Sequence, residues 1–232
     1  GKTVRNNAPR AEGSTMPVPP EILEHHKNVC LTLDIFFVNK IPFVVTLSKK
    51  IMFTAANHLL NRKMVTVFKA FKDIYKYYLQ RGFRITSVHA DHEFEPLRAH
   101  FNDMPRAPRL NIASADEHVP EVERRIRVIK ERVRAVRHSL PFDRMPKVIT
   151  IHMVLHVVKL LNYFPPKGGI SAQWSPRMLM AGQPLNYKTD LAIPFGAYCQ
   201  VHVQTQPRNS MSESKNCRCC MSWSIGEHPR RV

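Results

Sequence analysis

The sequence predicts an α/β fold, and three patterns carry this prediction. β-Branched and aromatic residues fill the run Val29–Val38, which stops at Asn39 as a strand would. Apolar residues recur at helical spacing within Lys63–Gln80, and Gly82 follows as a stop signal. A short strand, Arg84–Ala90, comes next. Strands and helices therefore alternate, which is the order typical of an α/β domain.

Four further segments complete the predicted elements. Phe43–Leu47 is an apolar run directly after the first strand, so the two strands are expected to form a hairpin, and Ile51–Ala55 is expected to be a third strand. Val119–His138 places apolar residues at spacings of four, three and four and predicts a helix with a basic coat. Lys147–Tyr163 predicts a final, mostly buried helix that ends before two prolines.

The chain length and the distribution of proline suggest one folded core with two flanks. A chain of 232 residues can bury one substantial core. Residues 1–27 are basic and rich in proline and are expected to be a linker with little structure of its own. Residues 28–188 form the expected core, and residues 189–232 form an extension that is ordered to about residue 203. The chain looks like an internal piece of a longer polypeptide.

The charge balance points to a polyanionic partner. Lysine and arginine number 35 against 18 aspartate and glutamate residues, a formal net charge of +17. Such a surplus favours DNA or RNA as partner, while a basic but inert surface remains the alternative. No stretch is apolar enough to predict a membrane span. Five cysteines, an odd number, favour a reducing and therefore intracellular compartment.

Three acidic residues are candidates for a metal-dependent site on nucleic acid. Asp34 lies within the first predicted strand, Asp91 directly follows a later strand, and Glu123 lies in the first turn of the basic helix. Phosphodiester chemistry can be performed by two Mg²⁺ or Mn²⁺ ions held by such carboxylates. Glu121 is the rival of Glu123. Glu93 is an accessory acid or only a brace of its turn.

The helix that carries Glu123 also carries the candidate nucleic-acid contacts. These are five basic side chains: Arg124, Arg127, Lys130, Arg134 and Arg137. Contacts from such side chains to phosphates would bind DNA without reading its sequence. A solvated helix face is the alternative. Asp116 and Glu117 are expected to cap the start of this helix.

Several segments of the chain follow a recognisable order. In Val122–Ala135 a Glu-Arg pair is followed by Arg, Glu and a terminal Arg-Ala, and His89–Phe94 contains an Asp followed by Glu-Phe. Leu161–Pro165, Ser175–Gly182 and Phe195–His202 come later. This series resembles the landmarks of copia-type retrotransposon integrases, in matching order, and covers roughly residues 28–203.

The resemblance implies a ribonuclease H-like fold, a mixed sheet that is antiparallel at its start and flanked by helices. It also implies an integrase catalytic core that performs 3′-end processing and strand transfer of element DNA into target DNA. Asp34, Asp91 and Glu123 fall on the catalytic and metal-binding acids of that family. Two Mg²⁺ or Mn²⁺ ions, double-stranded DNA, a homo-oligomer and a nuclear location are implied with them.

Two alternatives stay open at this point. His92 stands where the family has a glycine pair after the second aspartate, and no His-His-Cys-Cys zinc module precedes the predicted core. Both departures favour an inactive DNA-binding remnant. A metal-dependent nuclease of the same fold is the third hypothesis.

Overall fold

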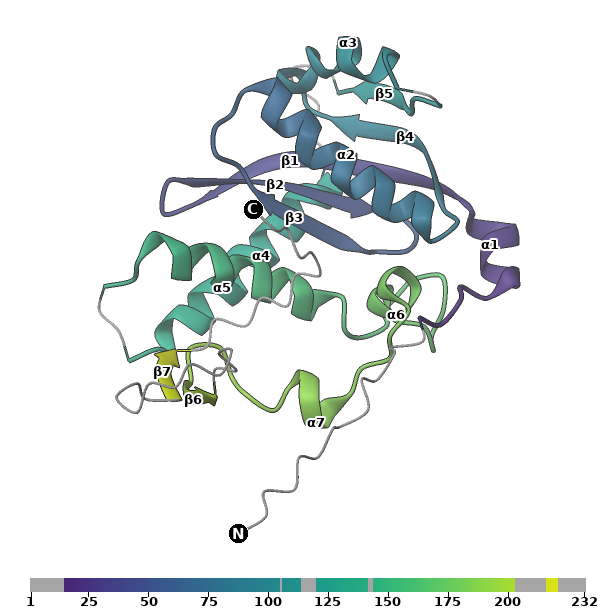
Figure 1. Cartoon of the computed structure of the whole chain (residues 1–232). Coiled ribbons are helices and arrows are strands. Elements are labelled where there is room, and N and C mark those ends of the chain that lie inside the picture. The colour runs from purple at the N-terminus through teal and green to yellow at the C-terminus, as the bar shows by residue number, and fades with distance from the viewer. Residues whose placement is uncertain (1–14, 105, 114–119, 142–143, 203–215, 221–232) are drawn as a thin grey trace, which may run out of the picture.

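A five-stranded sheet forms the centre of the molecule (Figure 1). The computed structural model describes residues 15–104, 106–113, 120–141, 144–202 and 216–220, the last segment and residues 198–202 by their backbone alone. The strand order is β3-β2-β1-β4-β5. The strands are β1 (Asn28–Val38), β2 (Ile41–Ser48), β3 (Thr54–His58), β4 (Arg84–Ala90) and β5 (Arg109–Ile112).

The sheet is mixed, and its first three strands are antiparallel. Strand β1 pairs antiparallel with β2, and β2 pairs antiparallel with β3. On its other side β1 pairs parallel with β4, which pairs parallel with β5. Asn39 and Lys40 both have positive φ, the conformation that a tight two-residue hairpin turn requires. The predicted α/β class and the mixed sheet that is antiparallel at its start are confirmed.

Two apolar cores lie on opposite faces of this sheet. One face packs against α2 (Met64–Gln80) and α3 (Leu97–Asn102). The other packs against α4 (Pro120–His138) and α5 (Lys147–Leu161). Side chains of β1 alternate between the two cores, with Leu33 and Ile35 on the α2 side and Phe36 on the α4 side. The central strand therefore contributes to both cores.

Most predicted boundaries agree with the structure, but the third strand is displaced. It runs from Thr54 to His58, whereas the sequence predicts Ile51–Ala55. Met52 has a φ of 60°, and the Phe53 amide donates to the Ser48 hydroxyl oxygen across a tight turn. Ile51 is buried in that turn, so its hydrophobicity serves the core without belonging to a strand.

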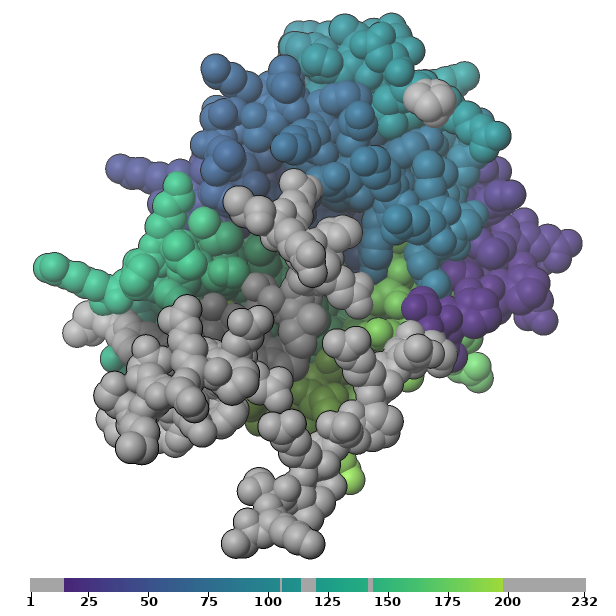
Figure 2. Space-filling model, viewed as in Figure 1, coloured from purple at the N-terminus to yellow at the C-terminus, as the bar shows by residue number. Residues whose placement is uncertain are grey.

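Part of the segment predicted to be a linker is structured. Helix α1 (Pro20–His26) precedes the sheet, and Val18 is buried in the α2-side core. The Met16 amide donates to the Gly182 carbonyl, and the Arg81 guanidinium donates to the Met16 carbonyl. In the space-filling view α1 and the chain before it, in purple, lie against the blue segment that contains α2 (Figure 2). The prediction of little structure in this segment is wrong for residues 15–27, because their apolar side chains find a place in the core.

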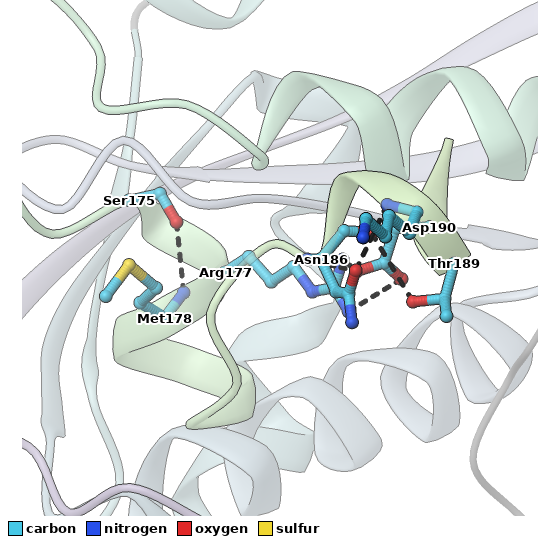
Figure 3. Close-up of polar contacts among 7 residues, drawn as sticks. Ser175, Arg177, Met178, Asn186, Thr189 and Asp190 are labelled. Carbon is cyan, nitrogen blue, oxygen red and sulfur yellow. Dashed lines mark hydrogen bonds and ion pairs between the residues drawn. The ribbon is translucent and has the colours of Figure 1, made fainter. Parts of the chain in front are cut away.

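The chain after α5 continues through two short helices, α6 (Pro176–Ala181) and α7 (Tyr187–Asp190). Arg177 and Asp190 form an ion pair, with side chains 12% and 11% exposed, and the guanidinium lies 4.6 Å from the Tyr163 ring centroid. The Asn186 amide also donates to Asp190, and the Ser175 hydroxyl caps α6 (Figure 3). This network fixes the two short helices to the end of α5.

Beyond α7 the described backbone forms a two-stranded antiparallel ribbon of β6 (Tyr198–His202) and β7 (Asn216–Cys220). Strand β7 lies past residue 203, where the sequence predicts no regular structure. It pairs with β6 and is not part of the five-stranded sheet. Among the described helices, none is long and apolar enough to cross a bilayer.

Candidate metal and nucleic-acid site

The register of the central strands brings Asp34 and Asp91 together. In the parallel pair of β1 and β4, Leu33 lies opposite Ala90. Asp34 and Asp91 are the next residue on each strand, and Asp91 keeps an extended backbone, with φ −72° and ψ 167°. Since neighbours in register point to the same face of a sheet, both carboxylates lie on the α4 side.

Helix α4 brings Glu123 to the same face. Its apolar stripe of Val122, Ile126, Ile129 and Val133 packs into the core beneath β1 and β2. Glu123 directly follows Val122, at the margin of this stripe, and is exposed. The helix therefore holds the Glu123 carboxylate beside the sheet, at the solvent-exposed edge of the buried interface.

The electrostatics of Asp34 show that the acids are near one another. Burial first, and then the charges of Asp91, Glu93 and Glu123 in that order of strength, raise the pKa of the Asp34 carboxyl to about 6. A hydrogen bond from the Ile35 amide, 2.6 Å from Oδ1, opposes this rise. Three other acidic groups thus act on one half-buried carboxylate, and their proximity is electrostatically unfavourable unless a cation or a proton offsets it.

The donor chemistry of this cluster fits a hard divalent cation, since carboxylate oxygens are the ligands that Mg²⁺ prefers. The described side chains are not, however, arranged as a coordination set: no three His, Cys, Asp or Glu residues among them lie close enough to share one ion. An ion at this place therefore requires side-chain rearrangement of the acids around Asp34.

Glu121, the rival of Glu123, faces a different neighbour. Its carboxylate lies 3.4 Å from the Lys49 ammonium in an exposed ion pair. The charges of Lys49 and Glu121 both act on His89, whose pKa is lowered by burial and by Lys49 and raised less strongly by Glu121. The charge of Glu123, and not that of Glu121, is among those that raise the pKa of Asp34. The geometry therefore favours Glu123 as the third acid.

Glu93 is closer to the site than the sequence suggests. It lies in the one-turn 3-10 helix η1 (His92–Phe94) that follows Asp91, and its carboxylate is 2.7 Å from the Arg62 guanidinium. Arg62 comes from the loop between β3 and α2, which the sequence does not connect with the acids. Only the packed sheet brings this loop to the end of β4, so no sequence signal marks Arg62.

Four of the five predicted basic contacts share the flank of α4 that carries Glu123. Arg127, Lys130, Arg134 and Arg137 follow Glu123 at steps of four, three, four and three residues, the spacing of one helical flank. They lie within about 40° of Glu123 around the helix axis. We call these four residues the basic row. Arg124 lies about 100° away from Glu123 and is separate from it.

Two further features are not part of this site: the predicted helix-capping residues and a small pocket. The predicted helix-capping residues, Asp116 and Glu117, lie outside the described residues. A small pocket is lined by His156, Lys159, Tyr163, Thr189, Asp190 and Ile193. It lies beside the Arg177–Asp190 pair rather than at the acids.

Comparisons with known proteins give a limited result. No family model matches the chain, and no curated protein matches it. Among solved structures, the catalytic core domain of BIV integrase is similar, with 17% identity and a TM-score of 0.42 over 65% of this chain and 92% of that domain. A TM-score below 0.5 reflects a partial superposition. The ribonuclease H-like assignment accordingly depends on the strand order, the mixed register and the two flanking helical layers.

Proposed function

We propose that this chain is the catalytic core of a retrotransposon integrase, a polynucleotidyl transferase that processes 3′ ends of element DNA and joins them to target DNA. The observation that carries the proposal is the position of Asp34 and Asp91 on neighbouring strands, with the charge of Glu123 acting on Asp34 from the helix that carries the basic row. Acids alone, or a basic row alone, would not distinguish an enzyme from a basic structural domain. Together they place candidate metal ligands beside candidate phosphate contacts.

In this proposal the protein residues have separate tasks. Asp34, Asp91 and Glu123 hold two Mg²⁺ or Mn²⁺ ions, and Glu93 is available as a further acid if Arg62 releases it. When bound, such ions neutralise charge on the scissile phosphate and activate first water and then a DNA 3′-hydroxyl. The basic row binds phosphates of the duplex and orients it along α4. Joining two ends to one target suggests a homo-oligomer, and genomic DNA as target implies action in the nucleus.

Strand transfer is the reaction that tests the proposal. A labelled, pre-processed donor end is incubated with plasmid DNA and Mn²⁺, and joined product is measured for the natural chain and for Glu123→Gln. We expect joined product from the natural chain and a loss of at least about 100-fold in the variant, since removal of one essential charged group typically costs several kcal/mol at the transition state.

Glu121→Gln is the matched control. It removes the same charge two residues earlier on the same helix, where the carboxylate pairs with Lys49 rather than acting on Asp34. Activity that survives Glu121→Gln and disappears in Glu123→Gln supports the assignment. Nicking of the plasmid without joining would instead identify a nuclease.

An inactive DNA-binding remnant is the second candidate. Two observations favour it: the described acids do not form a coordination set, and His92 opens a tight 3-10 turn directly after Asp91. DNA binding without metal-dependent joining or nicking, by the natural chain and by Glu123→Gln alike, would select this candidate.

A further inference from the structure

One part of the α4-side face of the sheet does not belong to the core. The apolar core on this side takes side chains from β1, β2 and β3, and among the described residues it contains none from β4 or β5. These two strands pack instead into the core on the other side, through Val88, Ala90 and Leu110. The α4-side face of β4 and β5 adjoins Asp91, which follows β4.

The residues on this part of the sheet are polar. Side chains alternate along a strand, so the neighbours of Val88 and Leu110 lie on the α4 side. They are Ser87 and His89 on β4, and Arg109 and Asn111 on β5. We call these four residues the polar shelf. Arg109 is exposed, and the other three are partly exposed. The parallel register pairs Ser87 with Arg109 and His89 with Asn111, so the shelf has two rungs.

His89 is held within its rung. The Asn111 side-chain amide nitrogen lies 3.3 Å from His89 Nε2. An amide nitrogen can only donate, so Nε2 accepts and the ring proton is on Nδ1. The charges of Lys49 and Glu121, which form an ion pair, act on the same ring. Asn111 therefore sets the tautomer of His89 and leaves Nδ1 as the ring's donor.

The spacing along β4 matches the repeat of a nucleic-acid backbone. Residues two apart on a strand share a face and are separated by about 6.6 Å. This step is close to the distance between successive phosphates along one DNA strand. A strand whose reacting phosphate lies at Asp91 can therefore bring its next phosphate to the rung of His89. The phosphate after that comes to the rung of Arg109.

We propose that the polar shelf is a track for the DNA strand that carries the reacting phosphate. His89 donates to the phosphate next to the reacting one, and the Arg109 guanidinium neutralises the phosphate beyond. Asn111 is a positioning residue, because it acts through the His89 ring. Such contacts fix the backbone and do not read the bases, so the track accepts any sequence. The inference rests on the proposed function for its substrate, a DNA strand held at the acids.

The test neutralises one phosphate at a time. Donor ends carry a single methylphosphonate at one of the terminal linkages of either strand, and a dideoxy 3′ end that cannot join. Affinity is measured by fluorescence anisotropy in Mn²⁺. We expect the natural chain to lose about five- to tenfold in affinity at one linkage, as for a hydrogen bond to a charged group. His89→Ala should lose the same factor on the unmodified backbone and nothing more at that linkage, because both changes remove one contact. Arg109→Ala should show the same coupling at the adjoining linkage.

Three variants complete the design. His89→Gln keeps an N–H donor and should keep part of the coupling, so it keeps the test decisive if urea unfolding shows that His89→Ala is not folded. Asn111→Ala should weaken the coupling of His89 without moving it to another linkage. Lys76→Ala is the matched control, because it removes an exposed cation from α2 on the opposite face of the sheet. It should leave the cost of every methylphosphonate unchanged.

The outcomes separate the track from the proposed function. The track is overturned when every methylphosphonate costs His89→Ala as much as it costs the natural chain, or when His89 and Arg109 couple to linkages that are not adjacent. Coupling at adjacent linkages, without joined product in the strand-transfer assay, would leave the track standing and refute the integrase function. Joined product without coupling would support the function and refute the track.

Discussion

Asp34 is the residue at which folding and the proposed function conflict. Its carboxylate is half-buried, accepts one hydrogen bond from the Ile35 amide, and feels the charges of three other acids. Its ionised form is therefore disfavoured in the folded chain relative to the unfolded chain. A side chain that costs stability and still occupies the central strand is typical of a site kept for chemistry.

This conflict predicts a stability change with pH. The pKa of Asp34 is about 6 in the folded chain and 3.8 ordinarily. The folded chain therefore binds more protons between these values, and its free energy of unfolding falls as pH rises from about 4 to about 7. Asp34→Asn keeps an acceptor for Ile35 and removes the charge, so it should be more stable than the natural chain at pH 7.5 by up to about 3 kcal/mol.

Urea unfolding in EDTA at pH 4, 5.5 and 7.5 measures this difference. The advantage of Asp34→Asn should vanish near pH 4, where the natural carboxyl is protonated. Asp73→Asn, on the exposed face of α2, is the control and should show no such trend. An equal or lower stability of Asp34→Asn at pH 7.5 would contradict the proposed environment of Asp34.

At the scale of elements, α4 does two separate things. One stripe of the helix anchors it under the sheet, and a neighbouring flank presents Glu123 and the basic row. The two roles coexist because an α-helix separates its faces by residue spacing alone. The opposite flank carries Arg125 and Arg132, whose charges act on each other: burial and Arg132 lower the pKa of Arg125.

The division of α4 predicts a directional effect on DNA binding. Lys130→Ala with Arg134→Ala should weaken duplex binding and reduce the slope of log affinity against log salt by about 0.9 for each phosphate that the variant no longer neutralises. Arg132→Ala and Arg124→Ala, on other faces of the same helix, should change the slope much less. Fluorescence anisotropy over a salt series gives the slopes. Equal reductions from all faces would indicate a diffuse charge effect instead of an aligned row.

The Arg177–Asp190 ion pair links the short helices α6 and α7. Burial tends to raise the pKa of the Asp190 carboxyl, but hydrogen bonds from Arg177 and from the Asn186 amide outweigh it and hold this pKa below its usual value. The pair therefore contributes stability above the ordinary pKa of an aspartate, and the contribution is lost as pH falls through the lowered pKa.

Arg177→Met should remove this contribution while keeping most of the side-chain volume. We expect a decrease of about 2–3 kcal/mol in the free energy of unfolding at pH 7, because Asp190 then remains poorly solvated with one donor fewer. Urea unfolding measures the decrease. Arg98→Met is the comparison: its pair with Glu95 is exposed, so only a small change is expected there.

At the scale of the whole molecule, the N-terminal segment closes the α2-side core. Gly182 has a φ of 67°, and a Cβ at this position would clash with the Thr15 side chain and lie 2.8 Å from the Met16 carbonyl. The chain before β1 therefore packs against the end of α6, and the two distant segments depend on each other. The predicted core boundary at residue 28 cuts through this packing.

Truncation tests the boundary. A chain that begins at residue 28 should be less stable than one that begins at residue 15 by at least about 2 kcal/mol, from the burial of Val18 and the hydrogen bonds of Met16. Thermal and urea unfolding of the two chains provide the comparison. Equal stability would show that residues 15–27 are a linker, as their composition suggests.

Sequence patterns predict the long elements well because each has a periodicity that local rules capture. The alternation in β1 and the helical spacing in α2 and α4 are both of this kind. They do not predict β5, since four residues with only Leu110 buried carry no periodic signal. Nor do they predict α1, because its stability comes from packing rather than from its own composition.

The sequence by itself determined the α/β order, the basic surface and the three acids, because charge and periodicity are properties of neighbouring residues. Only the tertiary structure decided which acids meet. The parallel register of β1 and β4 brings Asp34 beside Asp91, and α4 places Glu121 in an ion pair with Lys49 while the charge of Glu123 acts on Asp34. The structure also brought Arg62 to Glu93 and Phe37, since contacts between residues far apart in the chain depend on register and packing that no local pattern encodes.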